Sequence, residues 1–312
     1  MKNNQLIFKI LFIFFFISPV FASLETYVVT QIEGKIITNY DIKKEYNYLS
    51  ALNKEIEKLD NITGINIAKE SLIREKIKEI EIKKYFDVNK INSNMLEKTI
   101  KNLYINLGIE NTEEFEEYLD RYELNLDEIK EKFIIELFWN ELIKQKFTNL
   151  INVNIDLLKE EINKKNFTNK KIKEFNLLEI LFQVNTQSEL NKKIQEINQS
   201  ILENGFKNTA TIYSVSNTAK LGGQIGWIDE NKVSKIILDA INDLEIGEIS
   251  SPINLPNGFL ILKVENIKEK ESIVDKEKIL EDLVISEKQK QFDQFSLSYF
   301  NKIKLNTEIN EQ

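Results

Sequence analysis

The pattern of apolar and polar residues begins with two short runs typical of β-strands, at residues 27–32 and 35–38. Only two residues separate these runs, and one of them is Gly34, which favours a tight hairpin. A threonine and an aspartate with the spacing of a helix capping box follow at residues 38–41. We therefore expect a hairpin and then a helix that runs toward Leu59.

Apolar residues next recur every three to five positions in four segments, which is the period of amphipathic helices. The first of these follows an expected helix breaker at residues 61–64. Two later segments begin after Asn111 and Asn125, each of which has a glutamate three residues on that completes a capping signal. The apolar stripes cover residues 72–86, 93–107, 112–121 and 126–150.

The segment at residues 126–150 is strongly amphipathic, and two interpretations of its apolar side are open. We favour core packing within a helical domain, because most apolar helix faces serve that purpose. The alternative is a face that binds other polypeptides. A lysine-rich passage at residues 164–173 then ends the helical region, and we interpret it as a solvated linker and not as a binding patch.

The period changes at Phe175, where the pattern becomes one of alternating strands and helices. A strand is expected at residues 176–184. A helix is expected at residues 188–204, and Gly205 ends it. The further expected elements are helices at residues 206–213 and 233–241 and strands at 247–253 and 258–264. This order is typical of a compact α+β domain with a small sheet.

A long helix is expected at residues 272–302, with an apolar stripe that extends along its length. Such a stripe is unfavourable in water, so it must pack against another part of the protein. We expect it to return to the N-terminal helices, which would build one helical domain from both ends of the chain.

The motif Leu-Gly-Gly-Gln-Ile-Gly-Trp at residues 221–227 concentrates three of the nine glycines of the chain. Ile225 and Trp227 are two positions apart, as on one face of a strand, which argues against a flexible linker. A phosphate-binding loop is excluded because no Lys-Ser or Lys-Thr pair follows and no G-x-G-x-x-G frame exists. The motif therefore indicates a tight backbone path beside a strand.

The N-terminus has the organisation of a secretory signal peptide. Lys2 precedes an apolar run at residues 6–17, which Lys9 interrupts, so that the uninterrupted part covers residues 10–17. Small residues lead up to Ala22. We expect residues 1–22 to be removed by cleavage. A membrane anchor is the competing interpretation, but the uninterrupted apolar stretch is much shorter than the roughly 20 residues that span a bilayer. We therefore expect an exported protein with no stable membrane anchor, and periplasmic localisation.

The chain carries 50 acidic and 42 basic residues, which gives a formal charge of −8. Loss of Lys2 and Lys9 with the signal peptide leaves 50 acids against 40 bases, or −10. This acidic balance argues against nucleic acid as a partner, because phosphate contacts need clustered Lys and Arg.

The chain contains no cysteine and no histidine. Their absence excludes disulfides and thiolate chemistry, and it removes the usual general base and the commonest metal ligand. No nucleotide-binding motif is present either. We expect no metal and no cofactor.

Three motifs closely resemble those of the parvulin family of peptidyl-prolyl isomerases. They are the glycine motif at residues 221–227, Ile-Gly-Glu-Ile-Ser-Ser-Pro-Ile at 246–253 and Asn-Gly-Phe-Leu-Ile-Leu-Lys-Val at 257–264. The helical segments at both ends of the chain are similar to those of SurA-like periplasmic chaperones, by pattern more than by motif. SurA-like chaperones often carry two parvulin domains, and this chain has room for one.

The resemblance implies four segments and an α+β fold class: a helical chaperone domain built from N- and C-terminal segments, and a parvulin-type domain with a four-stranded sheet. The expected boundaries are 1–22 for the signal peptide, 23–174 for the N-terminal helical domain, 175–268 for the parvulin-like domain and 269–312 for the C-terminal helix.

The resemblance also implies a reaction, rotation about an X–Pro amide bond, which faces a barrier of roughly 18–20 kcal/mol. A parvulin would lower it by binding the twisted amide in a dry apolar pocket. The positions of that pocket correspond here to Val233, Ile237 and Phe259, with Gln224 as a further substrate-binding candidate. The pocket stays apolar but loses bulk.

The polar centre of the family, two histidines with an aspartate or cysteine, is not retained. Glu179 and Leu260 occupy the two histidine positions, and Ser216 occupies the third. Glu179 could act as a lone carboxylate, but we favour a strand residue that is hydrogen-bonded locally or faces solvent. We predict a degenerate domain with weak or no isomerase activity.

The leading hypothesis is an ATP-independent periplasmic chaperone that binds unfolded exported polypeptides, mainly outer-membrane β-barrel precursors. One alternative is an active isomerase that relies on desolvation of the substrate in the apolar pocket. Another is an assembly protein whose helical domain binds one specific partner.

Overall fold

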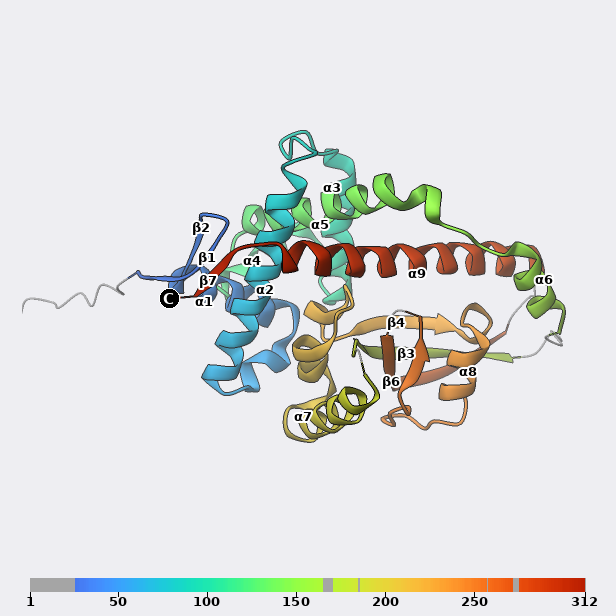
Figure 1. Cartoon of the computed structure of the whole chain (residues 1–312). Helices are drawn as coiled ribbons and strands as arrows, with labels where there is room; N and C mark the ends of the chain where they lie inside the picture. The colour runs from blue at the N-terminus through green and yellow to red at the C-terminus, as the bar shows by residue number, and fades with distance from the viewer. Residues whose placement is uncertain (1–25, 165–170, 185, 257, 272–274, 312) are drawn as a thin grey trace, which may run out of the picture.

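The computed structural model describes residues 26–164, 171–184, 186–256, 258–271 and 275–311. The signal peptide expected at residues 1–22 lies outside these ranges. The expected α+β class is confirmed: a helical domain is assembled from both ends of the chain, and a smaller α+β domain lies beside it (Figure 1).

The chain enters the helical domain through an antiparallel hairpin of β1 (Val28–Ile32) and β2 (Lys35–Thr38). Thr38 then caps α1 (Asn39–Leu52), since its hydroxyl accepts a hydrogen bond from the N–H of Asp41 at 3.2 Å. The Asp41 carboxylate accepts one in return from the N–H of Thr38 at 2.8 Å. The predicted hairpin and capping box are therefore confirmed.

The expected extension of α1 toward Leu59 is wrong. Asn53 leaves the helical conformation (φ −139°, ψ 96°), and its side chain caps the 3-10 turn η1 (Lys54–Lys58). Asparagine competes for local backbone hydrogen bonds in this way, which ends a helix that the apolar pattern alone would continue.

The expected helix breaker at residues 61–64 is also wrong, because α2 (Asn61–Ile82) begins there. The Asp60 carboxylate accepts hydrogen bonds from the N–H groups of Ile62 and Thr63 and so caps the helix. Gly64 serves close packing: a Cβ at this position would lie 2.6 Å from Cε2 of Tyr46. The helices α1 and α2 therefore approach each other more closely than larger residues allow.

The rest of the N-terminal part is helical, and the three predicted helices after α2 are confirmed with small changes of boundary. They pack on α1 and α2 around one apolar core. A further helix, α6, was not predicted. The elements are α3 (Ser93–Asn106), α4 (Thr112–Asp120), α5 (Leu126–Phe147), the 3-10 turn η2 (Thr148–Leu150) and α6 (Ile155–Lys164).

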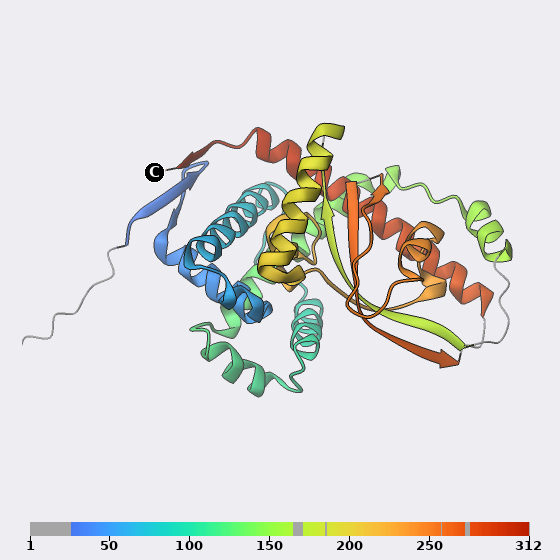
Figure 2. The ribbon, with the colours of Figure 1, turned by 90° about the horizontal axis from the view of Figure 1, so that it is seen from below.

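The C-terminal helix α9 (Lys276–Leu305) returns to the helical domain, as its apolar stripe predicted (Figures 1 and 2). Phe295 stacks on Phe147 of α5 with ring centroids 4.8 Å apart. The indole N–H of Trp139, also on α5, donates a hydrogen bond to Ser296 at 2.9 Å. After α9, the unpredicted strand β7 (Ile309–Glu311) pairs with β1 and makes a three-stranded sheet.

The α+β domain contains an antiparallel four-stranded sheet in the order β4-β3-β6-β5, as expected. Its central pair is formed by two long strands, and helices cover parts of both faces. In chain order the elements are β3 (Lys171–Phe182), α7 (Gln187–Tyr213, interrupted at Gly205), η3 (Ala219–Leu221), β4 (Gln224–Asp229), η4 (Glu230–Lys232), α8 (Lys235–Ile241), β5 (Ile253–Leu255) and β6 (Gly258–Glu271).

Two strand boundaries in this domain differ from the expectation. Lys171 and Lys173 belong to β3 and are not part of a linker, because β3 extends to pair with the far end of β6. The expected strand at residues 247–253 is reduced to β5 and an isolated bridge between Ile249 and Lys263. Within residues 164–173, the stretch 165–170 lies outside the described residues.

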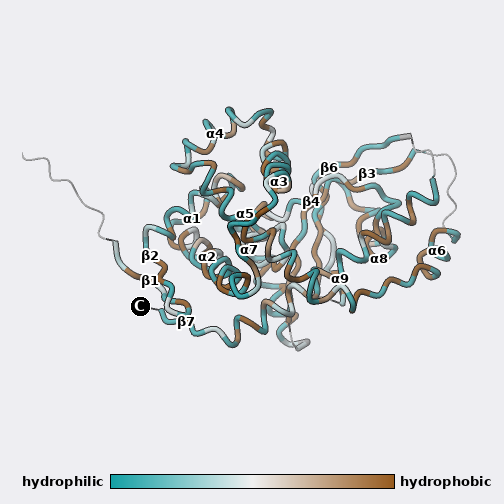
Figure 3. The backbone as a smooth tube through the Cα atoms, turned by 90° about the horizontal axis from the view of Figure 1, so that it is seen from above, coloured by the Kyte–Doolittle hydropathy of each residue, from teal (hydrophilic) through white to brown (hydrophobic). Residues whose placement is uncertain are grey.

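Polar and apolar residues alternate along the elements of both domains (Figure 3). In the described part of the chain, no helix is both long enough and apolar enough to cross a membrane.

Candidate functional site

The glycine motif forms the turn that leads into β4, and its geometry fixes the position of Glu179. Gly222 and Gly223 have positive φ angles of 66° and 78°, which favour glycine. A Cβ on Gly223 would lie only 2.2 Å from the carbonyl oxygen of Glu179. The N–H of Glu179 donates a hydrogen bond to the carbonyl of Gly223 at 2.8 Å. Glycine is required here because the backbone of β3 passes directly against the turn.

The Glu179 carboxylate is held by two hydroxyl groups from the loop between α7 and β4. Ser216 donates a hydrogen bond to Oε1 of Glu179 at 2.5 Å, and Thr218 donates to the same oxygen at 2.8 Å. The two hydroxyls are 3.1 Å apart. The structure thus brings together two of the three positions that hold the polar centre in parvulins, and the result is a locally satisfied carboxylate.

Leu260, at the third position, is buried in an apolar cluster on the same side of the sheet. It lies opposite Leu181 of β3 and Ile253 of β5, and it packs in one cluster with Ile241. Leu260 has no polar group in its side chain. Glu179 therefore has no hydrogen-bonding partner at position 260 of β6.

The four predicted substrate-binding residues do not share one surface. Ile237 packs at the edge of the apolar cluster that contains Leu260. Val233 is buried after η4, and Gln224 is exposed at the start of β4. Phe259 lies on the opposite face of the sheet, where its ring stacks on Phe182 with centroids 5.8 Å apart.

Helix α9 passes along the α+β domain (Figures 1 and 2). Asp282 of α9 forms an ion pair with Lys232 of η4 at 2.9 Å. Farther along α9, burial raises the pKa of Asp293 to about 6, with an additional contribution from the negative charge of Glu179. A helix from the helical domain therefore contributes a second carboxyl group to the surroundings of Glu179.

Sequence reasoning missed Thr218 and Asp293. Thr218 lies two residues after Ser216, so a search for hydroxyls beside the degenerate positions could have found it. Asp293 carries no comparable signal, because its approach to Glu179 depends on how the long helix lies across the neighbouring domain.

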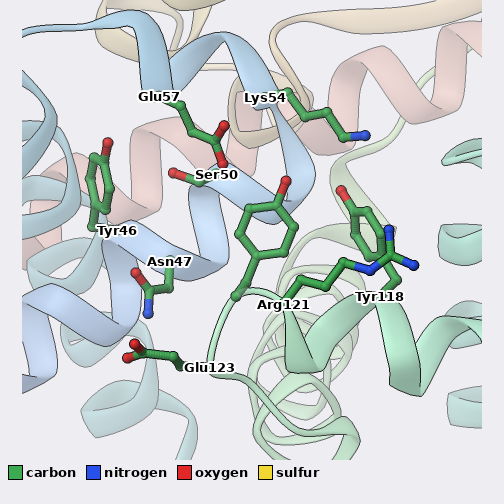
Figure 4. A pocket seen from close by; sticks show the side chains of 9 residues that line it. Tyr46, Asn47, Ser50, Lys54, Glu57, Tyr118, Arg121 and Glu123 are labelled. Atoms are coloured by element: carbon green, nitrogen blue, oxygen red, sulfur yellow. The ribbon is translucent and has the colours of Figure 1, made fainter.

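One hollow lies in the helical domain, between α1, η1 and the end of α4 (Figure 4). We call it the tyrosine pocket. Its volume is about 370 Å³, and it is lined by Tyr46, Asn47, Ser50, Lys54, Glu57, Tyr118, Arg121, Tyr122 and Glu123.

Tyr118 is held in place within the tyrosine pocket by two neighbours. The hydroxyl of Tyr118 donates a hydrogen bond to the carbonyl of Ala51 at 2.7 Å, and Lys54 lies 5.5 Å from the centre of its ring. The buried hydroxyl of Ser50 has no hydrogen-bond partner among the described residues. Tyrosine rings beside charged side chains suit adaptable contacts with peptide-like ligands.

The described residues include no group of three or more Asp, Glu, His or Cys side chains that could hold a metal ion. The polar groups that line the tyrosine pocket are carboxylates, hydroxyls, one amide, one lysine and one arginine.

Comparison with known proteins identifies the α+β domain. Residues 177–266 match the family model of the rotamase, or PPIC-type PPIase, domain. The chain is 38% identical over 87 residues to the chaperone SurA of Hydrogenovibrio crunogenus, which is 28% of this chain and 19% of that protein. It is 30% identical over 154 residues to the chaperone SurA of Salmonella typhimurium, which is 47% of this chain and 35% of that protein.

The chain thus spans only about a fifth to a third of the length of these relatives. Among solved structures, a SurA-like chaperone of Campylobacter jejuni matches 91% of this chain and 98% of its own, with 16% identity and a TM-score of 0.36. The protein contains a PPIC-type, or parvulin-type, domain and is similar to SurA chaperones.

Proposed function

We propose that this protein is an ATP-independent periplasmic chaperone that binds unfolded exported polypeptides, mainly outer-membrane β-barrel precursors, and that its parvulin-type domain has weak or no isomerase activity. The observation that carries the proposal is the Glu179 site, where a carboxylate is bonded to Ser216 and Thr218 and faces no polar residue at position 260. The similarity to SurA chaperones supports the chaperone assignment.

The loss of isomerase activity follows from what the site offers a prolyl amide. An isomerase must bind the twisted amide more tightly than the planar one. At this site the hydroxyls of Ser216 and Thr218 are already used by Glu179, so they are not directed at a substrate. The ion pair between Asp282 and Lys232 also keeps α9 beside the α+β domain, where it would restrict the approach of an extended chain.

Binding of unfolded polypeptides would fall to the helical domain. The tyrosine pocket supplies tyrosine rings and two cations at Lys54 and Arg121. Such a surface makes modest contacts with many sequences, which is what reversible binding without nucleotide hydrolysis requires.

A test of the chaperone proposal is dilution of a urea-denatured outer-membrane β-barrel into buffer with the protein that lacks residues 1–22. We expect light scattering to be delayed at stoichiometric amounts, and we expect ATP to make no difference. Unchanged scattering at a several-fold molar excess would remove the proposal.

An active isomerase remains the second candidate, because Ile237 and Leu260 keep this side of the domain apolar and desolvation alone needs no proton transfer. Proline-limited refolding of a small protein separates the two candidates. We expect no acceleration beyond the uncatalysed rate. Acceleration that Ile237→Ala abolishes would favour the enzyme, and Phe259→Ala is the matched control because Phe259 faces the opposite side of the sheet.

A further inference from the structure

A buried group of charged residues lies where the two domains meet, and we call it the seam cluster. The α+β domain contributes Lys220, which lies in η3 just before the glycines of the glycine motif. Helices α1, α2 and α5 contribute the other residues. The seam cluster consists of the carboxylates Glu45, Glu75 and Glu136 and the cations Arg74, Lys78, Lys132 and Lys220.

The carboxylates of the seam cluster are all paired. Lys132 lies 2.6 Å from Glu45 and 2.9 Å from Glu75, and the second oxygen of Glu75 lies 3.6 Å from Lys220. The remaining oxygen of Glu45 accepts a hydrogen bond from Ser71 at 2.5 Å. Lys78 lies 2.7 Å from Glu136. The three carboxylates are therefore paired with three lysines.

Arg74 is the cation in excess. No carboxylate oxygen of the described residues lies within ion-pair distance of its guanidinium, whose pKa burial lowers from the ordinary value. Its nearest acidic influences are Glu136, which Lys78 holds, and Glu70. The Glu70 side chain is 60% exposed and lies 3.9 Å from Lys304. Within the seam cluster four cations face three carboxylates, and the further compensation that Arg74 receives from Glu70 comes from a side chain that is mostly exposed to solvent.

The excess charge is not sealed inside the protein, because Arg74 lines a hollow of about 240 Å³ between the domains. We call this hollow the seam pocket. The helical domain contributes Ile67, Glu70 and Arg74, and the α+β domain contributes Ile212 and Lys220. Two cations beside apolar side chains, with one carboxylate that is mostly exposed, fit a ligand that carries an anionic group next to a small apolar group.

The arginine at position 74 indicates which kind of anionic group the ligand carries. Apart from Arg121, Arg74 is the only arginine in a chain that otherwise uses lysine for positive charge. A guanidinium presents a planar fork that matches the two oxygens of a carboxylate, and it stays charged under partial burial. The volume suits one or two residues of a peptide and is too small for a larger ligand.

We propose that the seam pocket binds a carboxylate of a client polypeptide, either its free carboxyl end or an acidic side chain, with an adjacent apolar residue against Ile67 and Ile212. This inference rests on the proposed function, because it takes unfolded polypeptides as the ligands. Since both domains line the pocket, a bound carboxylate would also hold the two domains together.

The test uses three fluorescein-labelled apolar hexapeptides and the full chain without residues 1–22. One peptide ends in a free carboxylate, one ends in an amide, and one ends in an amide but contains a glutamate. We expect the first or the third to bind about tenfold more tightly than the plain amide in fluorescence anisotropy. Whichever binds more tightly identifies the source of the carboxylate, and equal affinities for all three peptides would overturn the proposal.

The role of Arg74 is tested separately with Arg74→Met and Arg74→Lys. We expect Arg74→Met to abolish the preference for the carboxylate peptide and Arg74→Lys to retain part of it. Lys130→Met is the matched control, because Lys130 pairs with the exposed Asp127 and lines neither the seam pocket nor the tyrosine pocket. A full preference in Arg74→Met, or an equal loss in Lys130→Met, would overturn the assignment to the seam pocket.

The chaperone proposal and this inference fail in different ways. If the wild-type protein delays aggregation but does not distinguish the peptides, only the carboxylate site is wrong. If it binds the carboxylate peptide through Arg74 but does not delay aggregation, the site stands as a peptide site and the chaperone function is wrong.

Discussion

Two sites in this molecule hold glutamate carboxylates in place, and they pair these carboxylates with different partners. Glu179 in the α+β domain is bonded to two neutral hydroxyls from a neighbouring loop of its own domain. Glu45 and Glu75 in the helical domain are bonded to lysines from α5 and from the glycine motif's preceding turn. The first arrangement is local, whereas the second joins segments from both domains.

The difference shows what each site contributes. Removal of a neutral hydroxyl from Glu179 leaves a carboxylate that is still partly accessible to water. Removal of a lysine from the seam cluster leaves a charge that is buried, and a buried unpaired charge is far more costly than a lost hydrogen bond. We therefore expect the loss of one partner in the seam cluster to destabilise the arrangement of the domains far more than the loss of one hydroxyl partner destabilises the Glu179 site.

The strongest test of this comparison is Lys132→Met. Glu45 is fully buried and would lose its closest cation, so we expect the free energy of unfolding to fall by about 4 kcal/mol at pH 7. Urea unfolding measures it. Lys130→Met on the same helix is the control, because Lys130 pairs with an exposed Asp127 and should change stability by about 0.5 kcal/mol or less.

The pH dependence of Lys132→Met has a defined sign. Burial alone would raise the pKa of Glu45, but Lys132 and Lys220 lower it below its ordinary value of 4.5. The wild type therefore has this stabilisation above pH 4.5 and loses it as the pH falls through the lowered pKa. In the variant the pKa of Glu45 rises, so the deficit should be smaller at pH 4 than at pH 7. A deficit independent of pH would mean that lost packing, and not charge, is responsible.

The next largest effect is expected at the turn against Glu179. Gly223→Ala places a Cβ 2.2 Å from a backbone oxygen at a positive φ, so we expect a loss of about 3 kcal/mol. Gly226→Ala is the matched control, since Gly226 also has positive φ but no atom within 4 Å of the added Cβ. It should cost about 1 kcal/mol. Equal losses would show that the conformation of the turn, and not its contact with β3, requires glycine.

The smallest effect is expected for Asp293→Asn, and it has the opposite sign. Because the pKa of Asp293 is raised from 3.8 to about 6, its ionisation opposes folding as the pH rises through this range. The variant should therefore be more stable than the wild type by about 1–2 kcal/mol at pH 7.5 and no more stable at pH 3.5. Urea unfolding at the two pH values measures this. An unchanged stability at pH 7.5 would mean that the ionised Asp293 carries no penalty from burial in the folded protein.

The sequence predicted most elements of the fold because each depends on neighbours in the chain. The hairpin before α1 and the capping box at residues 38–41 are local, and the apolar stripe of α9 is continuous. The two boundary errors at Asn53 and Gly64 have a different origin. A side-chain cap ends the first helix, and contact with Tyr46 keeps glycine inside the second.

The site was less accessible to sequence reasoning than the fold. The position of Glu179 followed from motif spacing, but Asp293 and Arg74 meet their surroundings only through the packing of one domain on the other. A lysine in the turn before the glycine motif has the appearance of an ordinary surface residue. Nothing in the spacing indicates that Lys220 lies 3.6 Å from Glu75 of α2.

The pairing of β7 with β1 has a consequence for the order in which the protein folds. Thr30 and Glu311 are neighbours in one sheet although almost the whole chain separates them, and contacts of such long separation form slowly. The strands β3, β4 and β6, in contrast, belong to one uninterrupted segment between the two halves of the helical domain. We expect folding to proceed from the middle of the chain outward, so that the helical domain closes last, once the final strand has been delivered.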